Sequence, residues 1–186
     1  PGVIDSQDIS LNISREMLQN NPVITKIKKG ITTKILNEIT TFSSKEVDTY
    51  LKFWSNFGAV IKEGLYEFND HHDKILPLLR FQTSESEDLI SLDDYLKKIK
   101  SDQKEIYYFA NTDKDHIKNS PQLEAFIANK IPVLFMTDAV DEFWLQNIQK
   151  FKEKEFKSIT KGKVDLSKLK IDSDKKDKIN KNISKI

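Results

Sequence analysis

The spacing of apolar residues changes near the middle of the chain, and this change restricts the possible folds more than any other feature. From residue 23 to residue 42, apolar side chains recur at helical spacing and fall mainly on one stripe of a helical wheel. Asn21 and Pro22 stand before this stripe as a capping residue and a first-turn proline. A capping box at residues 43–46 precedes a second stripe over residues 47–57. The first 82 or so residues are therefore predicted to be helical.

Beyond residue 88, apolar residues also form short continuous runs, which are typical of buried strands. Residues 106–109 and 131–136 have this composition, and a helix that begins at Ser120 and Pro121 separates them. Such a β-α-β unit has a right-handed crossover, which makes its two strands parallel. A third strand is expected at residues 156–159.

Together, the two patterns predict an α/β fold of mixed type. A helical region is followed by a small three-layer α/β/α subdomain with a short, mainly parallel sheet. Residues 82–88 carry no aliphatic side chain, so they suit a surface connection. We therefore expect a helical subdomain at residues 21–82 and the α/β/α subdomain at residues 83–160. Residues 161–186 are rich in lysine and contain no aromatic residue, which predicts a mobile tail or linker.

The balance of charge argues against several classes of partner. Lys and Arg total 30 against 29 Asp and Glu, so no overall positive field favours nucleic acid or an anionic membrane. The lysine-rich tail interleaves Asp with Lys and lacks stacking residues, which makes nucleic-acid binding a weak alternative. No apolar run approaches the roughly 20 residues that span a bilayer, and no export signal is visible. The chain has no cysteine, which is compatible with a reducing cytoplasm.

Familiar catalytic and metal-binding patterns are missing from the sequence. No glycine-rich phosphate loop is present, and no nucleophile elbow singles out a serine. His71 and His72 are adjacent, so on a helix they diverge by about 100° and cannot form the usual metal-binding pair. His116 is distant in sequence. We therefore expect no metal site and no independent hydrolase activity.

Arginine use is unusual, because only Arg15 and Arg80 occur in a chain that otherwise uses lysine. Arginine presents a planar fork of donors that suits phosphate oxygens, so Arg15 is a candidate for phosphate recognition. The alternative is structural: Arg15 pairs with Glu16 or Asp8, or donates to carbonyls near a turn. Arg80 ends a predicted helix, where its charge complements the helix dipole.

Residues 5–19 read D-S-Q-D-I-S-L-N-I-S-R-E-M-L-Q and resemble the motif D-S-E-D-L-P-L-N-[IL]-S-R-E-x-L-Q of the heat-shock protein 90 chaperones, here in the bacterial HtpG form. Gln7 and Ser10 depart from the usual acid and proline. The resemblance covers about residues 2–161. Further stretches match in order: Phe53-Trp54 through Gly58, Lys62-Glu63-Gly64, residues 78–81, residues 106–108, Ser120-Pro121, residues 133–138 and Asp141-Glu142.

The resemblance implies a middle-domain fragment of an ATP-dependent protein-folding chaperone. Residues 1–20 would be the catalytic-loop segment of a truncated large middle subdomain. Arg15 would contact the γ-phosphate of ATP and Gln19 would help to order the loop and nucleotide. ATP and Mg²⁺ would be bound mainly by a domain absent from this chain, so this part alone is not expected to hydrolyse ATP. An absent C-terminal domain would form the homodimer, in the cytoplasm.

The same resemblance implies surface for unfolded or near-native client proteins, besides contacts with other domains of the chain. A helix is predicted at residues 139–151, with one stripe through Val140, Trp144, Ile148 and Phe151. Client-binding candidates are Phe143, Trp144 and Leu145, beside two acidic residues. In the alternative interpretation Trp144 belongs to the core. A different class of function, a non-catalytic protein-interaction module, stays open.

Overall fold

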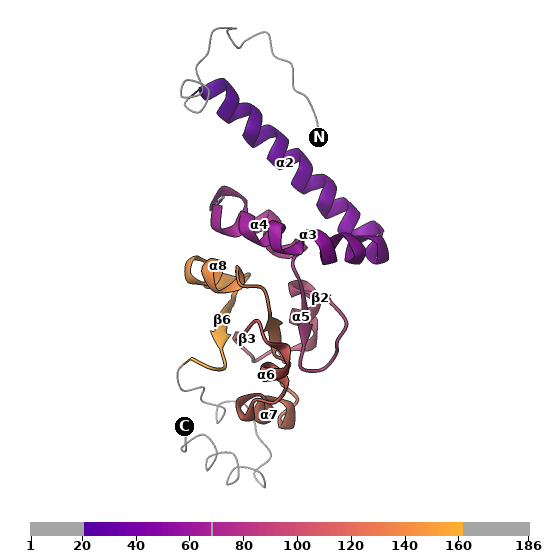
Figure 1. The fold of residues 1–186 in the computed structure, drawn as a ribbon, viewed down its shortest axis with the longest axis vertical. Helices are drawn as coiled ribbons and strands as arrows, with labels where there is room; N and C mark the ends of the chain where they lie inside the picture. The colour runs from indigo at the N-terminus through magenta and orange to yellow at the C-terminus, as the bar shows by residue number, and fades with distance from the viewer. Residues whose placement is uncertain (1–20, 68, 162–186) are drawn as a thin grey trace.

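The computed structural model describes residues 21–67 and 69–161 (Figure 1). A helical hairpin lies at one end of this part of the chain, a sheet lies in the middle, and two short helices lie at the other end. None of the helices in these ranges is both long and apolar enough to cross a membrane. Arg15, Gln19 and all but the first residue of the predicted tail lie outside the described residues.

The hairpin consists of α2 (Pro22–Lys45) and α3 (Val47–Glu67). Asn21 caps α2 as predicted, because its side chain accepts a hydrogen bond of 2.8 Å from the amide of Val23. The predicted capping box at residues 43–46 is wrong. The hydroxyl of Ser43 instead donates to the carbonyl of Thr40 at 2.9 Å, since residue 43 still lies inside α2.

Only the second half of α2 reaches the core. Leu36 is buried there, and Ile39 and Phe42 pack against the same apolar cluster. Ile35, which belongs to the predicted stripe, is instead exposed. The helical wheel therefore predicted the buried side of α2 slightly wrongly, because the position of α3 decides which residues of α2 are covered by the core.

Short helical turns connect the hairpin to the sheet. They are η1 (Asn69–His71), α4 (His72–Ile75) and η2 (Leu76–Leu78). The chain then enters strand β1 (Arg80–Thr83), so the prediction of an all-helical segment up to residue 82 is wrong at its end. β1 pairs with β4 about 50 residues further along the chain, and local spacing does not reveal this pairing.

The six strands run in the order β2-β1-β4-β3-β6-β5. At the centre, β3 (Glu105–Ala110) pairs in parallel with β4 (Leu134–Met136), as the sequence predicted. On its other side β3 pairs in parallel with β6 (Lys154–Ser158), which includes most of the third predicted strand. The other three pairings are antiparallel and involve β1, β2 (Ile90–Ser91) and β5 (Lys150–Phe151). The result is a mixed sheet with a parallel centre.

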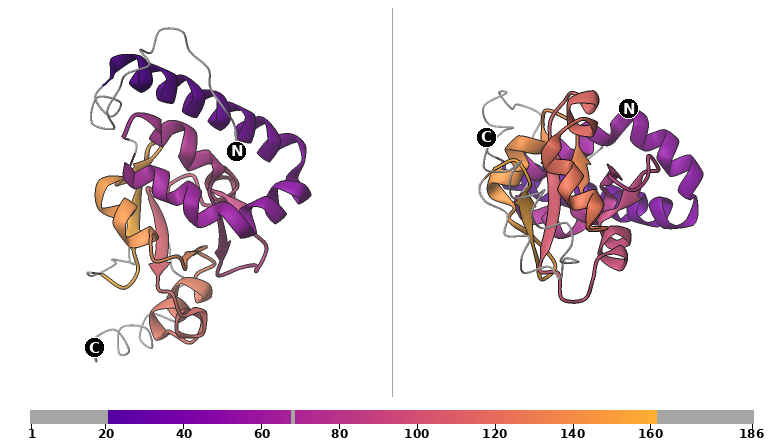
Figure 2. Two further views of the ribbon diagram at one scale, coloured as in Figure 1. Left: turned by 45° about the horizontal axis from the view of Figure 1, so that its top comes forward. Right: turned by 90° about the horizontal axis from the view of Figure 1, so that it is seen from below.

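Alternate residues of β3 divide the core into two layers. Tyr107 and Phe109 face a cluster built with α6 (Lys114–Lys118) and α7 (Pro121–Ala128). Ile106 and Tyr108 face the opposite cluster, which includes residues of α3, α5 (Leu92–Lys98) and α8 (Asp141–Asn147). Residues of β3 alternate between the two clusters because successive side chains of a pleated strand point to opposite faces of the sheet. Helices therefore cover both faces of the sheet, as the predicted α/β/α layering requires (Figure 2).

Helix α8 is shorter than predicted. It ends at Asn147, and Ile148 adopts an extended backbone at φ −112° and ψ 100°. Phe151, which the wheel placed on the helical stripe, belongs instead to β5 and pairs with Lys154. The burial of Phe151 is thus achieved by strand pairing and not by helix packing.

The buried hydroxyl of Tyr95 ties α5 to the sheet. It donates to the carbonyl of Pro132 at 2.8 Å and accepts from the amide of Tyr107 at 3.1 Å. We expect Tyr95→Phe to lower the free energy of unfolding by about 1–3 kcal/mol, because two buried backbone groups lose a partner. Urea denaturation measures this change. Tyr66→Phe removes an exposed hydroxyl and serves as the control; equal losses in both variants would contradict the assignment.

Candidate functional site

A buried ammonium group lies where α3 meets α8. The Nζ atom of Lys62 is 2.8 Å from a carboxylate oxygen of Asp138 and 2.8 Å from one of Asp141. The side chains of Lys62 and Asp141 are 2% and 0% exposed, whereas Asp138 lies partly in solvent. The structure therefore joins two of the sequence motifs, residues 62–64 and 133–138, which stand far apart in the chain.

The carboxylate of Asp141 has further donors around it. The indole N–H of Trp144 donates at 2.9 Å, and the amide of Asp138 donates at 3.1 Å. Burial raises the pKa of Asp141, and this effect outweighs the lowering by Lys62 and by the hydrogen bonds from Trp144 and Asp138. Lys62 also lies over the ring of Phe81, 4.6 Å from its centroid, which adds a cation–π contact.

This arrangement is closed and fully paired, so it suits a structural role. Among the described residues, no buried side-chain nitrogen or oxygen is left without a hydrogen-bond partner. No group of His, Asp and Glu in those residues could hold a metal ion. We call Lys62, Asp138, Asp141 and Trp144 the latch, because they connect the helical hairpin to the loop after β4 and to α8.

The predicted client-binding trio does not stay together. Trp144 is fully buried, and its ring packs edge-on against Phe156 with centroids 5.5 Å apart. It therefore leaves the proposed client surface and belongs to the core. Leu145 is half-buried against the same core, while Phe143 is exposed.

An exposed aromatic residue of α3 accompanies Phe143. The ring of Tyr66 lies edge-on to that of Phe143, with centroids 6.3 Å apart and an angle of 67° between the planes. Sequence reasoning missed Tyr66. Tyr66 is four residues after Lys62, so both lie on the same side of α3. Only the tertiary structure shows that α8 packs against this side and brings Phe143 next to Tyr66.

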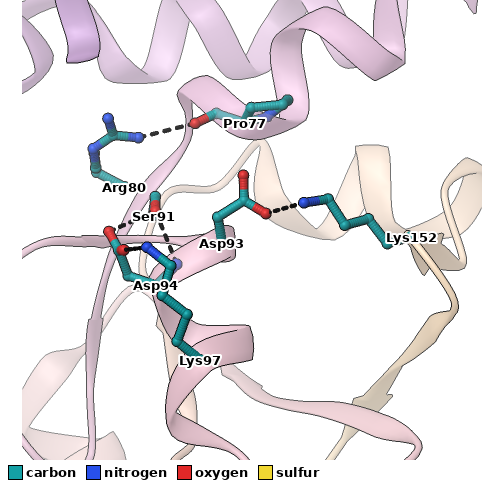
Figure 3. A network of polar contacts seen from close by, with 7 residues as sticks. All are labelled: Pro77, Arg80, Ser91, Asp93, Asp94, Lys97 and Lys152. Carbon is teal, nitrogen blue, oxygen red and sulfur yellow. Dashed lines mark hydrogen bonds and ion pairs between the residues drawn. The ribbon is translucent and has the colours of Figure 1, made fainter. Parts of the chain in front are cut away.

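Arg80 has a structural role, which Figure 3 shows. One guanidinium nitrogen, Nη1, donates to the carbonyls of Pro77, Leu78 and Leu79 at 3.0–3.1 Å. The guanidinium carbon also lies 4.7 Å from the centroid of the Tyr50 ring. Arg80 thus serves carbonyls at a helix end, in agreement with the sequence prediction, although it stands in β1.

Ordinary capping and surface pairing account for the polar residues beside Arg80. Ser91 caps α5, since its hydroxyl oxygen accepts from the amide of Asp94 at 3.0 Å. Lys97 pairs with Asp94 at 2.8 Å, and Lys152 pairs with Asp93 (Figure 3). These contacts fix the start of α5 and carry no further chemistry.

The three histidines are also separate. His71 is buried, and the Nε2 atom of His72 lies 2.8 Å from the carbonyl oxygen of Leu65. His116 in α6 contacts the ring of Phe109. Arg15 and Gln19, the candidates for nucleotide contact, lie outside the described residues.

Comparisons with known proteins give a consistent result. The family model described as Hsp90 protein matches residues 1–186. The chaperone protein HtpG of Roseobacter denitrificans is 49% identical over 168 residues, which cover 90% of this chain and 27% of that protein. The HtpG of Wolbachia pipientis wMel is 43% identical over 182 residues, covering 97% and 29%. The chain thus spans less than a third of these relatives.

A solved structure supports the same conclusion about the fold. The chain is similar to the middle domain of a Plasmodium falciparum heat shock protein, with a TM-score of 0.70 and 30% sequence identity. The similarity covers 77% of this chain and 61% of the other. The observed order of helices and mixed sheet is therefore shared with a known domain.

The latch yields a prediction about stability. We expect Lys62→Met to lower the free energy of unfolding by about 3–5 kcal/mol, because it leaves a buried carboxylate without its counter-charge. The double variant Lys62→Met/Asp141→Asn should recover part of this loss. Guanidinium denaturation measures both.

Lys29→Met is the matched control for this measurement. Lys29 pairs with Asp70 at 3.2 Å, but both side chains are largely exposed, so the change should be about 1 kcal/mol or less. Similar losses for Lys29→Met and Lys62→Met would show that the burial of the latch has no special importance.

Proposed function

Since the chain belongs to the Hsp90 family, we propose that it works as the later part of the middle domain of an ATP-dependent molecular chaperone that assists protein folding. The observation that carries this proposal is the match of the family model over residues 1–186, and the similarity to a solved middle domain agrees with it. In the whole protein, ATP with Mg²⁺ would be held mainly by a separate N-terminal domain. A C-terminal domain would form the homodimer, and the chaperone would act in the cytoplasm.

The proposed catalytic contribution of this chain is Arg15. Its planar fork would contact the γ-phosphate and stabilise charge that develops during hydrolysis, while Gln19 would help to order the loop and nucleotide. Support comes from the motif at residues 5–19, in which Arg15 stands at the position of the motif's arginine. The described residues alone are not expected to hydrolyse ATP.

The proposed client surface lies at α8. Phe143 is exposed next to Glu142, and Leu145 presents the part of its side chain that the core leaves uncovered. Exposed apolar side chains with a charged rim are typical of protein interaction sites. Unfolded or near-native client segments would bind there.

A non-catalytic interaction module is the second candidate function. It is favoured by the exposed aromatic residues of the described part, Tyr66 and Phe143, which are available for contact with a partner protein without any nucleotide. The two functions differ in one geometric requirement. In a nucleotide-bound structure of the whole protein, the chaperone proposal needs Arg15 within hydrogen-bond distance of a phosphate oxygen, and the alternative does not.

We expect Arg15→Ala in the whole protein to lower ATP turnover by a factor on the order of 10³, with little change in ATP affinity, because the contact strengthens only as charge develops on the phosphate. Steady-state ATPase rates and nucleotide titration measure the two quantities. Arg15→Lys keeps the charge but loses the fork, so it should recover little activity. An unchanged rate in Arg15→Ala would remove the proposed role.

We expect Phe143→Ser to weaken client binding by about fivefold to thirtyfold, which corresponds to about 1–2 kcal/mol for an exposed aromatic contact. Phe143→Ser/Leu145→Ser should weaken binding further, with some loss of stability because Leu145 is half-buried. ATPase rates should be unchanged. Titration of a labelled unfolded client gives the affinity, and parental binding by the double variant would exclude this surface.

A further inference from the structure

We propose that the client surface is shared by two helices: Tyr66 of α3 and Phe143 of α8 form one aromatic patch, which binds an apolar client side chain flanked by lysine or arginine. This inference rests on the proposed function and specifies the chemistry of its client segments. Tyr66 is assigned here as a binding residue.

The two rings form a continuous apolar surface that is open to solvent. Tyr66 is 59% exposed and Phe143 is 56% exposed, although the rings contact each other edge-on. An edge-on pair leaves part of a ring face accessible on each partner, and an apolar side chain can lie against both. Burial of aromatic carbon is the main source of affinity at protein interaction sites.

Two exposed carboxylates lie next to this patch. Glu63 lies three residues before Tyr66 on the same side of α3, and Glu142 directly precedes Phe143; both are exposed. Lys161 is 3.9 Å from Glu142, a long ion pair between exposed groups that neutralises this charge only weakly. A lysine or arginine beside the bound apolar residue would therefore meet carboxylates and the faces of two aromatic rings.

The nearest lysine on the same side of α3 does not offset this acidity at the surface. Lys62 is buried, and its charge is matched by Asp138 and Asp141. A segment with acidic residues would meet the carboxylates of Glu63 and Glu142, and within residues 21–67 and 69–161 only the exposed Lys161 forms an ion pair with either of them, which disfavours such a segment. The preference for basic flanking residues thus follows from the pairing within the latch.

The latch also fixes the geometry of the patch. Lys62 is one helical turn from Tyr66, and Asp141 is two residues from Phe143, so the ion pair holds α3 and α8 together directly beside the rings. A surface that is already assembled binds without first ordering its parts, which favours affinity. The contact between the two helices is part of the fold and does not depend on a client.

The experiment uses the whole chaperone and three short, unstructured, fluorescently labelled peptides. One has leucines flanked by lysine, the second has the same leucines flanked by glutamate, and the third has serine in place of leucine. Anisotropy titrations should show that the lysine peptide binds at least about fivefold more tightly than the glutamate peptide, and that the serine peptide binds weakly.

Variants then test each helix. Tyr66→Ser should weaken the binding of the lysine peptide by about fivefold or more, as Phe143→Ser is expected to do. Tyr66→Phe keeps the ring and should bind this peptide with the affinity of the parent protein. Phe57→Ser is the matched control, since Phe57 is another exposed aromatic residue of α3. Glu63→Gln/Glu142→Gln should reduce the difference between the lysine and glutamate peptides. Circular dichroism confirms that each variant folds.

The outcomes separate the two levels of the proposal. If Phe143→Ser weakens binding but Tyr66→Ser and the glutamine variant do not, the shared patch and its charge preference are wrong, while the client surface at α8 stands. If neither ring affects binding, the client surface itself is wrong. A self-association that requires Tyr66, seen by sedimentation without peptide binding, would assign the patch to a second copy of the chain and overturn the inference.

Discussion

The contact between the ammonium group of Lys62 and the carboxylate of Asp141 is the interaction on which the arrangement of this chain depends. Both groups are removed from water, so each would be strongly destabilising without the other. The pair joins a helix of the hairpin to the helix that follows β4, and Trp144 and the amide of Asp138 complete its hydrogen bonds. The hairpin and the sheet are thereby held as one unit, with a single apolar cluster running from Leu36 to Phe151.

The position of the exposed aromatic residues is a consequence of this contact. Once Asp141 faces Lys62, the short helix α8 can turn only one side toward the core, and Trp144 is fully buried on that side. Phe143 must then point outward, next to Tyr66 of the other helix. The contact between α3 and α8 therefore has a buried ion pair that stabilises the fold and, beside it, exposed aromatic side chains that are available to a partner.

Much of the fold could be predicted from local patterns, and the failures have a common cause. The cap at Asn21, the helical hairpin and the parallel pairing of β3 with β4 follow from short-range spacing and from the handedness of β-α-β units. Strands β2 and β5 are only two residues long, and β1 is held in the sheet by β4, about 50 residues further along the chain. Their residues carry too little local pattern to be distinguished from a loop or from the end of a helix.

The sequence by itself determined the family, through residues 5–19 and the motifs that follow, and it determined the order of helices and central strands. It also singled out Phe143 as a candidate for client binding. Only the tertiary structure decided that Trp144 is core, that α8 ends before Phe151, that Lys62 pairs with Asp141, and that Tyr66 stands beside Phe143. The physical reason is the distance along the chain between groups in contact: helix periodicity acts over a few residues, whereas the two contacts between α3 and α8 join groups more than 70 residues apart, as in the pair Lys62 and Asp141 at a separation of 79. Their geometry is set by the packing of whole elements, which no local pattern contains.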